Sequence, residues 1–184
     1  FLYFADHEGE LGHIVSAGRR SFLEQFASLT SPDIQKKFSE PSDIETFRRC
    51  KLDHSERLKN NGVYSLHRDL LKLRGEDPVF GAQRTDWMHG AVLGREAFVM
   101  RFFGGDEGDR LVLVNLGKDL KMSPAPEPLL SPPEDSHWEV LWSSEAALYG
   151  GNGTPPVEDG GHWLLPGHSV IVMAPKKIAR AHHV

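Results

Sequence analysis

The apolar positions in the first part of the chain follow a helical period. Between residues 11 and 26 they recur at spacings of three and four, which predicts a helix with one apolar stripe. Pro32 and Pro41 then mark an irregular, charged connection. The stripe consists of Leu11, Val15, Gly18, Phe22 and Phe26.

A second amphipathic helix is expected from about Asp53. Asp53 can accept hydrogen bonds from the first backbone N–H groups, and Glu56 follows three residues later, as in a capping box. Gly75 and Pro78 are expected to end the helix. Its predicted buried face consists of Val63, Leu66, His67, Leu70 and Leu73.

After residue 80 the pattern changes to short strand-like runs separated by glycine and proline. The residues at 104–109, GGDEGD, are typical of a solvated hairpin loop, and the five prolines of 124–133 indicate a surface excursion. Trp138, Val140 and Trp142 alternate and should share one face of a strand. With no helix between them, the runs predict an antiparallel sandwich. The runs are 97–103, 110–117, 138–142 and 168–175.

The two helical stripes and the strand-like residues 1–4 have no obvious partner in this chain. Two amphipathic helices cannot cover a sandwich and also bury each other as a separate domain. We therefore expect the chain to be a piece of a larger protein, whose missing part covers these apolar faces.

Composition narrows the classes of partner. Of the 184 residues, 39% are hydrophobic and 26% are charged, a composition that is ordinary for a globular protein. The net charge of -5 gives no overall positive potential that would attract nucleic acid or anionic membranes. No apolar run approaches a membrane span, and no secretion signal is recognisable. Cys50 is the single cysteine, which excludes an internal disulfide and favours a reducing cytoplasm.

The order of several segments resembles the end of the malto-oligosyltrehalose trehalohydrolases of the α-amylase superfamily. FADHEGELG (4–12), RCKLD (49–53) and LWSSE (141–145) are the more specific segments, while LHRDLLKLRGEDP (66–78) and ALYGG (147–151) are shared more widely. One departure is His54, where the family commonly has tryptophan, so a stacking role there is in doubt.

The resemblance implies an α+β chain: the last strand and helices of a (β/α)₈ barrel over residues 1–82, then an all-β antiparallel sandwich of the α-amylase carboxyl-terminal type over residues 83–184. The family releases trehalose by cleaving the adjacent α-1,4-glucosidic bond. Its catalytic acids follow earlier barrel strands, so they are expected upstream of residue 1, and no catalytic residue, cofactor or metal is expected here. The expected partners are the missing barrel domain and an α-glucan substrate.

Asp6, His7 and Glu8 are the candidate substrate-binding residues. They would lie on the loop after the last barrel strand, at the face where barrel enzymes keep their active sites. A carboxylate and an imidazole there can hydrogen-bond sugar hydroxyls. The alternative is structural: Asp6 caps the helix that starts near Gly9, and His7 is partly exposed.

Other side chains favour ordinary roles. The ten histidines show no zinc-type spacing, and Cys50 has no recognisable general-base partner. The tryptophans suit a sugar-stacking platform or, as strand positions favour, a sandwich core. Two further functions stay open, namely a fragment of glycogen branching enzyme, suggested by ALYGG, and a free-standing carbohydrate-binding module.

Overall fold

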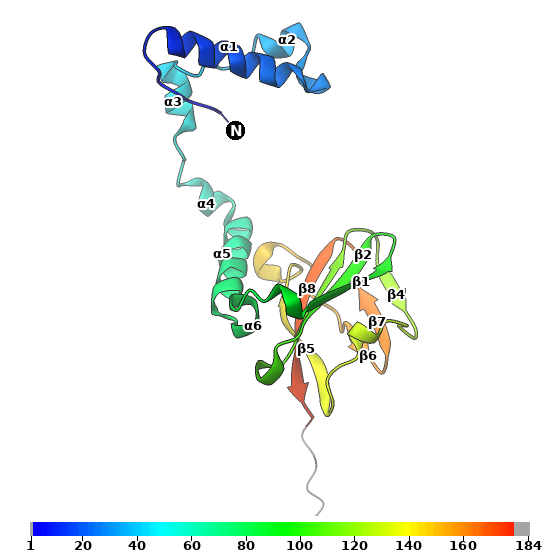
Figure 1. Cartoon of the computed structure of the whole chain (residues 1–184). Helices are drawn as coiled ribbons and strands as arrows, with labels where there is room; N and C mark the ends of the chain where they lie inside the picture. The colour runs from blue at the N-terminus through cyan, green and yellow to red at the C-terminus, as the bar shows by residue number, and fades with distance from the viewer. Residues whose placement is uncertain (1, 179–184) are drawn as a thin grey trace, which may run out of the picture. The chain divides into compact units, whose positions relative to one another are not determined.

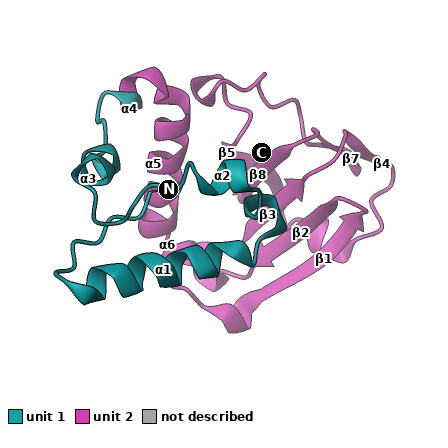
Figure 2. Cartoon of the chain, turned by 90° about the horizontal axis from the view of Figure 1, so that it is seen from above, with its two compact units in different colours: residues 1–56 teal, residues 57–184 magenta. Residues whose placement is uncertain are grey.

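The computed structural model describes residues 2–178, which form two compact units, residues 1–56 and residues 57–184 (Figure 2). The first unit is helical, and the second combines helices with antiparallel sheets (Figure 1). The boundary predicted at residue 82 refers to domains of a larger parent, and it stays a prediction.

The first unit confirms the first predicted helix. Pro32 begins α2, and Pro41 lies in the irregular connection between α2 and α3, as the sequence indicated. On the helix, Leu11 is 52% exposed and Phe22 is 58% exposed, so the apolar stripe has no cover within the described residues. The elements are α1 (Glu10–Glu24), η1 (Ala27–Leu29), α2 (Pro32–Gln35) and α3 (Ile44–Cys50).

The strand expected at residues 1–4 is absent where the structure describes it, at residues 2–4. Instead, the Phe4 ring packs on Phe47 with centroids 5.0 Å apart, and the Ala5 N–H donates to the Pro41 carbonyl at 3.0 Å. A strand needs a neighbour to satisfy its backbone groups, and residues 2–4 have no strand beside them. Residue 1 lies outside the described residues.

The second predicted helix begins later than expected. α5 spans Asn61–Glu76, after a separate short turn, α4 (Glu56–Lys59), and before α6 (Pro78–Gly81). Asp53 accepts a hydrogen bond from the Ser55 N–H at 2.9 Å, so it shapes the turn before α4 and does not cap α5. The start of the long helix was therefore predicted too early, because the Asp53 side chain forms a local turn.

The packed face of α5 is also rotated from the predicted one. Gly62 lies against the Tyr149 backbone, where an added Cβ would meet the Tyr149 carbonyl oxygen at 3.0 Å, and Ser65 is buried. Val63 and His67 were expected to be buried, but both are exposed. Small residues let the helix approach Tyr149 closely. The size of the side chains, as well as their hydrophobicity, therefore decides which side of α5 is packed.

The rest of the second unit consists of two antiparallel sheets. One has the strand order β1-β2-β3-β8-β5 and the other the order β4-β7-β6. The four predicted runs correspond to β2, β3, β5 and β8, while β1, β4, β6 and β7 were not foreseen. The strands are β1 (Met88–Gly94), β2 (Ala97–Phe102), β3 (Arg110–Asn115), β4 (Leu120–Met122), β5 (Ser136–Ser143), β6 (Glu158–Asp159), β7 (His162–Leu165) and β8 (Ser169–Lys177). Four 3₁₀ turns join these elements, η2 (Thr85–Trp87), η3 (Gly105–Glu107), η4 (Pro128–Leu130) and η5 (Ala147–Tyr149).

One hydrophobic core receives side chains from both sheets. Alternate residues of the central strands point into it, which is why Leu111 and Leu113 of β3 are both almost fully buried. Burying a side chain of this size contributes about 1.5–3 kcal/mol. The buried cluster consists of Val99, Leu111, Leu113, Leu130, Trp138, Val157, Trp163, Leu165, Ile171 and Met173.

A β-bulge in β5 separates the two tryptophans that were predicted to share a face. The register with β8 shifts between Val140 and Trp142. Because one extra residue reverses the inward and outward alternation, Trp138 lies in the core and Trp142 lies on the other face of the sheet. Trp138 pairs with Pro175 and Val140 with Met173, so these two residues share a face, and the prediction of one shared face is wrong for Trp142.

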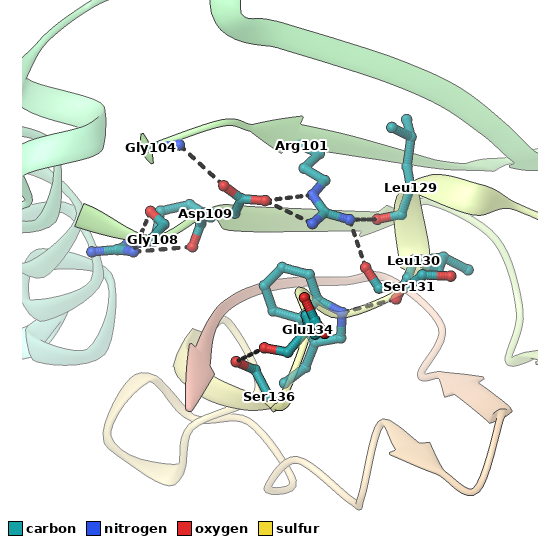
Figure 3. Close-up of polar contacts among 11 residues, drawn as sticks. Arg101, Gly104, Gly108, Asp109, Leu129, Leu130, Ser131, Glu134 and Ser136 are labelled. Carbon is teal, nitrogen blue, oxygen red and sulfur yellow. Dashed lines mark hydrogen bonds and ion pairs between the residues drawn. The ribbon is translucent and has the colours of Figure 1, made fainter. Parts of the chain in front are cut away.

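The proline-rich segment 124–133 runs mostly at the surface, as expected, and it is also pinned to the sheets by hydrogen bonds (Figure 3). Arg101 donates to the Leu129 carbonyl at 3.0 Å and to the Ser131 carbonyl at 2.6 Å. The Trp138 indole donates to the Leu130 carbonyl at 2.8 Å, and the Leu130 side chain is in the core. Proline has a backbone carbonyl but no backbone N–H, so a proline-rich segment has more hydrogen-bond acceptors than donors. Side-chain donors such as a guanidinium or an indole can therefore hold the segment in place.

Within residues 2–178, no helix combines the length and the apolar character needed to cross a membrane.

Candidate functional site

The predicted site residues Asp6, His7 and Glu8 lie together on the loop before α1. All three are exposed, and no hydrogen bond or ion pair ties their side chains to another described residue. The N-cap of α1 is Gly9, which receives no side-chain hydrogen bond. The alternative in which Asp6 caps α1 is therefore not what the structure shows. The three polar side chains remain available to an external ligand.

Two glycines shape this loop. Gly9 adopts a φ of 58°, a left-handed conformation that glycine adopts without strain. At Gly12, an added Cβ would lie 2.8 Å from the carbonyl oxygen of His7. The Gly12 N–H donates to the Gly9 carbonyl at 3.2 Å and closes the first turn. Together, Gly9 and Gly12 allow the chain to turn sharply from the Asp6–Glu8 loop into the helix.

Two buried carboxylates elsewhere are fully occupied by the fold. Asp109 accepts from the Arg101 guanidinium at 2.6 and 2.8 Å through one oxygen, and from the Gly104 N–H at 3.2 Å through the other (Figure 3). Asp77 accepts from Arg110 at 2.8 Å with one oxygen and from two backbone N–H groups at the start of α6 with the other. With every oxygen engaged, neither carboxylate offers a free acceptor to a sugar.

A hydrogen-bonded chain links α5 to the outer face of the large sheet. The Trp142 indole donates to the Tyr149 hydroxyl at 3.0 Å, and that hydroxyl donates to Asp69 at 2.9 Å. Hydrogen bonds from Arg68 and then from Tyr149 lower the pKa of the Asp69 carboxyl. Desolvation, followed by the hydrogen bond to Asp69, raises the pKa of the Tyr149 hydroxyl. The chain fixes α5 on the ALYGG turn and has a structural role.

The tryptophans do not form a shared sugar platform. Trp138 is buried in the core, as the core interpretation predicted, and so is Trp163, whereas Trp142 lies on the opposite face. Trp87 is 38% exposed, but the Arg84 guanidinium stacks on its ring at 3.6 Å. Across the described part of the chain, no group of three histidine, cysteine or acidic side chains is placed to hold a metal ion. The Cys50 thiol contacts the Leu2 carbonyl at 3.6 Å.

Sequence reasoning missed a cavity in the first unit. Its wall includes Arg19 and Arg20 from α1 and Arg49 from α3. The sequence contains two pairs of adjacent arginines, at 19–20 and 48–49. Helical spacing within each segment gives no reason to expect the two pairs to lie close together. Only the fold brings the two helices to one cavity.

A family model and a curated enzyme each match part of this chain. Residues 85–172 match a family model described as a domain of unknown function, DUF3459. The chain is 34% identical over 123 residues to the malto-oligosyltrehalose trehalohydrolase of Deinococcus radiodurans, a match that covers 66% of this chain and 20% of that enzyme.

A solved structure shares the fold. The crystal structure of Bacillus licheniformis trehalose-6-phosphate hydrolase aligns with a TM-score of 0.51 at 17% identity, covering 76% of this chain and 22% of that one. The chain thus spans about a fifth of the length of the relatives it matches. The resemblance that the sequence motifs indicated is confirmed: this chain is similar in sequence to a malto-oligosyltrehalose trehalohydrolase, and its residues 85–172 match the DUF3459 domain.

Proposed function

We propose that this chain is the carboxyl-terminal part of a glycoside hydrolase that releases trehalose from malto-oligosyltrehalose by cleaving the adjacent α-1,4-glucosidic bond. The observation that carries the proposal is the 34% identity to a trehalohydrolase over 123 residues. That match covers 20% of the relative, which suits one part of a larger enzyme.

In this proposal, residues 1–82 complete a catalytic (β/α)₈ barrel and residues 83–184 form the β-sandwich that follows it. The uncovered apolar residues support a missing neighbour: Leu11 and Phe22 on α1, and Val63 and Leu71 on α5, are all more than half exposed. Contiguous exposed apolar surface is typical of an interaction site. The barrel domain is the proposed occupant, and the parent enzyme is proposed to act on α-glucan in the cytoplasm.

The catalytic acids are proposed to lie on the barrel, upstream of residue 1. Retaining glycosidases need two carboxyl groups about 5 Å apart, one as nucleophile and one as acid. In the second unit, the buried carboxylates Asp77 and Asp109 are engaged by arginines and backbone N–H groups. We therefore expect the 184-residue chain alone to release no trehalose from malto-oligosyltrehalose. Release above a no-protein control, by a preparation free of the parent enzyme, would refute this.

Asp6, His7 and Glu8 are proposed to contact the substrate at the mouth of the barrel. Their exposure and the absence of any capping bond for Asp6 leave these side chains free for sugar hydroxyls. Directional hydrogen bonds of this kind select polar ligands.

The test is Asp6→Ala in the full-length parent. We expect kcat/KM for malto-oligosyltrehalose to fall by one to two orders of magnitude, which is about 1.4–2.7 kcal/mol of transition-state binding. Thermal stability should change little, because Asp6 is exposed and tied to no other described side chain. Asp33→Ala is the matched control, since that carboxylate is 88% exposed and pairs with Lys36 on the surface. Unchanged kinetics in Asp6→Ala, or an equal loss in both variants, would contradict the site assignment.

A further inference from the structure

The first unit contains a cavity of about 380 Å³. Its size lies within the range of sites that hold small molecules. It lies between α1, the segment 37–41 and α3, so its wall is built from positions far apart in the sequence. The polar part of the wall consists of Ser16, Arg19, Arg20, Lys37, Ser39, Glu40 and Arg49.

The cavity wall is strongly cationic although the whole chain is acidic. Four of its side chains are basic and Glu40 is its one acidic side chain, whereas the chain carries a net charge of -5. The Ser16 hydroxyl donates to Glu40 at 2.5 and 2.8 Å, so this carboxylate is already engaged. The nearest Arg20 nitrogen is 3.5 Å from Glu40, which is a weak contact.

The remaining cations have no carboxylate partner among the described residues. Arg49 donates to the neutral hydroxyl of Ser39 at 3.0 Å, and Arg19 stacks on the Tyr3 ring at 4.6 Å. A guanidinium has five N–H donors, so most donors of Arg20 and Arg49 remain unused in the protein. Guanidinium groups in this state bind phosphate with two parallel hydrogen bonds.

We propose that this cavity binds a small organic phosphate, with Arg20 and Arg49 holding the phosphate group. The remaining wall is apolar, with Leu2, Leu23 and Leu29 beside Tyr3. Such a wall favours a ligand with a carbon body over a bare ion, because apolar surface is removed from water when that body binds. The site is separate from the Asp6–Glu8 loop, and it does not depend on the proposed hydrolytic function.

The test is calorimetric titration of the 184-residue chain at constant ionic strength with three probes: glucose 6-phosphate, inorganic phosphate and glucose. We expect glucose 6-phosphate to bind most tightly, inorganic phosphate more weakly, and glucose not measurably. Arg20→Gln and Arg49→Gln should each weaken glucose 6-phosphate binding about tenfold, the usual cost of losing a charged hydrogen bond. Arg95→Gln is the matched control, because Arg95 is exposed in the second unit and its substitution removes the same charge.

Each result decides the proposal. Weakening by Arg20→Gln and Arg49→Gln, with Arg95→Gln unchanged and all three variants folded by circular dichroism, supports the site. Absence of glucose 6-phosphate binding overturns it, as does equal weakening by Arg95→Gln, which would indicate general charge attraction. Equal affinity for inorganic phosphate overturns the role of the apolar wall.

Discussion

The substitution Asp109→Ala tests whether the buried Arg101–Asp109 pair holds the second unit together. It removes both carboxylate oxygens and leaves Arg101, which is 8% exposed, with two backbone carbonyls and the rings of Phe103 and Trp138 as partners. It also removes the acceptor of the Gly104 N–H at the start of the hairpin loop. The guanidinium would then be a buried charge without a counter-ion.

The size of the effect follows from the burial of the pair. Removing one partner of a buried ion pair usually costs about 3–5 kcal/mol. Here the side chains of Arg101 and Asp109 are 10% and 13% exposed, so water reaches part of the pair. We therefore expect Asp109→Ala to lower the free energy of unfolding by about 2–4 kcal/mol.

Urea denaturation followed by tryptophan fluorescence measures this loss. All four tryptophans, at positions 87, 138, 142 and 163, belong to the second unit, so the signal reports the unfolding of that unit. Asp106→Ala is the matched control, because Asp106 is exposed on the same loop and should change stability by less than about 0.5 kcal/mol.

Two outcomes would refute the reasoning. One is a loss in Asp109→Ala no larger than that in Asp106→Ala, which would mean that water satisfies Arg101 as well as the carboxylate does. The other comes from the double variant Arg101→Met with Asp109→Leu, which removes both charges and should be less destabilising than Asp109→Ala. A greater loss in the double variant would show that the penalty does not arise from an unpaired charge.

Three further predictions concern the core, an acid-sensitive contact and the uncovered helix. Leu113→Ala should cost about 2–5 kcal/mol in the same fluorescence assay, because Leu113 is 1% exposed in the shared core; a loss below about 1 kcal/mol would show the core to be loosely packed. The pKa of Asp69 is held below its ordinary value of 3.8, so its stabilising effect is present above that value and is lost as the pH falls through the lowered pKa. Asp69→Asn should therefore flatten the decline in stability below about pH 4, and an unchanged pH profile would contradict this. Phe22→Ala should alter the stability of this chain by less than about 0.5 kcal/mol, since Phe22 is 58% exposed, yet destabilise the full-length parent by about 2 kcal/mol; equal small effects would argue against a covering barrel.

The sequence predicted those elements whose signal is local. The helical period between residues 11 and 26 corresponds to α1, and the apolar, strand-like runs at 97–103 and 110–117 correspond to β2 and β3. β1 was missed because His89, Gly90 and Gly94 interrupt its apolar pattern. β7 was missed because its four residues are too short for a clear alternation. Both become strands by pairing with stronger neighbours.

The candidate loop was also accessible to sequence reasoning, because its residues are consecutive. Asp6, His7 and Glu8 are adjacent in the chain, so their proximity needed no fold. What the sequence could not give was the conformation: the expected cap by Asp6 is replaced by the backbone geometry of Gly9.

The sequence by itself therefore determined the likeness to a trehalohydrolase, the helix–sheet division and the identity of the exposed polar loop, all of which depend on neighbours along the chain. The tertiary structure decided the contacts between distant residues. It pinned 124–133 through Arg101, and the bulge in β5 moved Trp142 out of the core. It also gathered Arg20 and Arg49 at one cavity. The physical reason is that packing and ion pairing depend on distance in space, and a linear pattern specifies that distance only within one helix or strand.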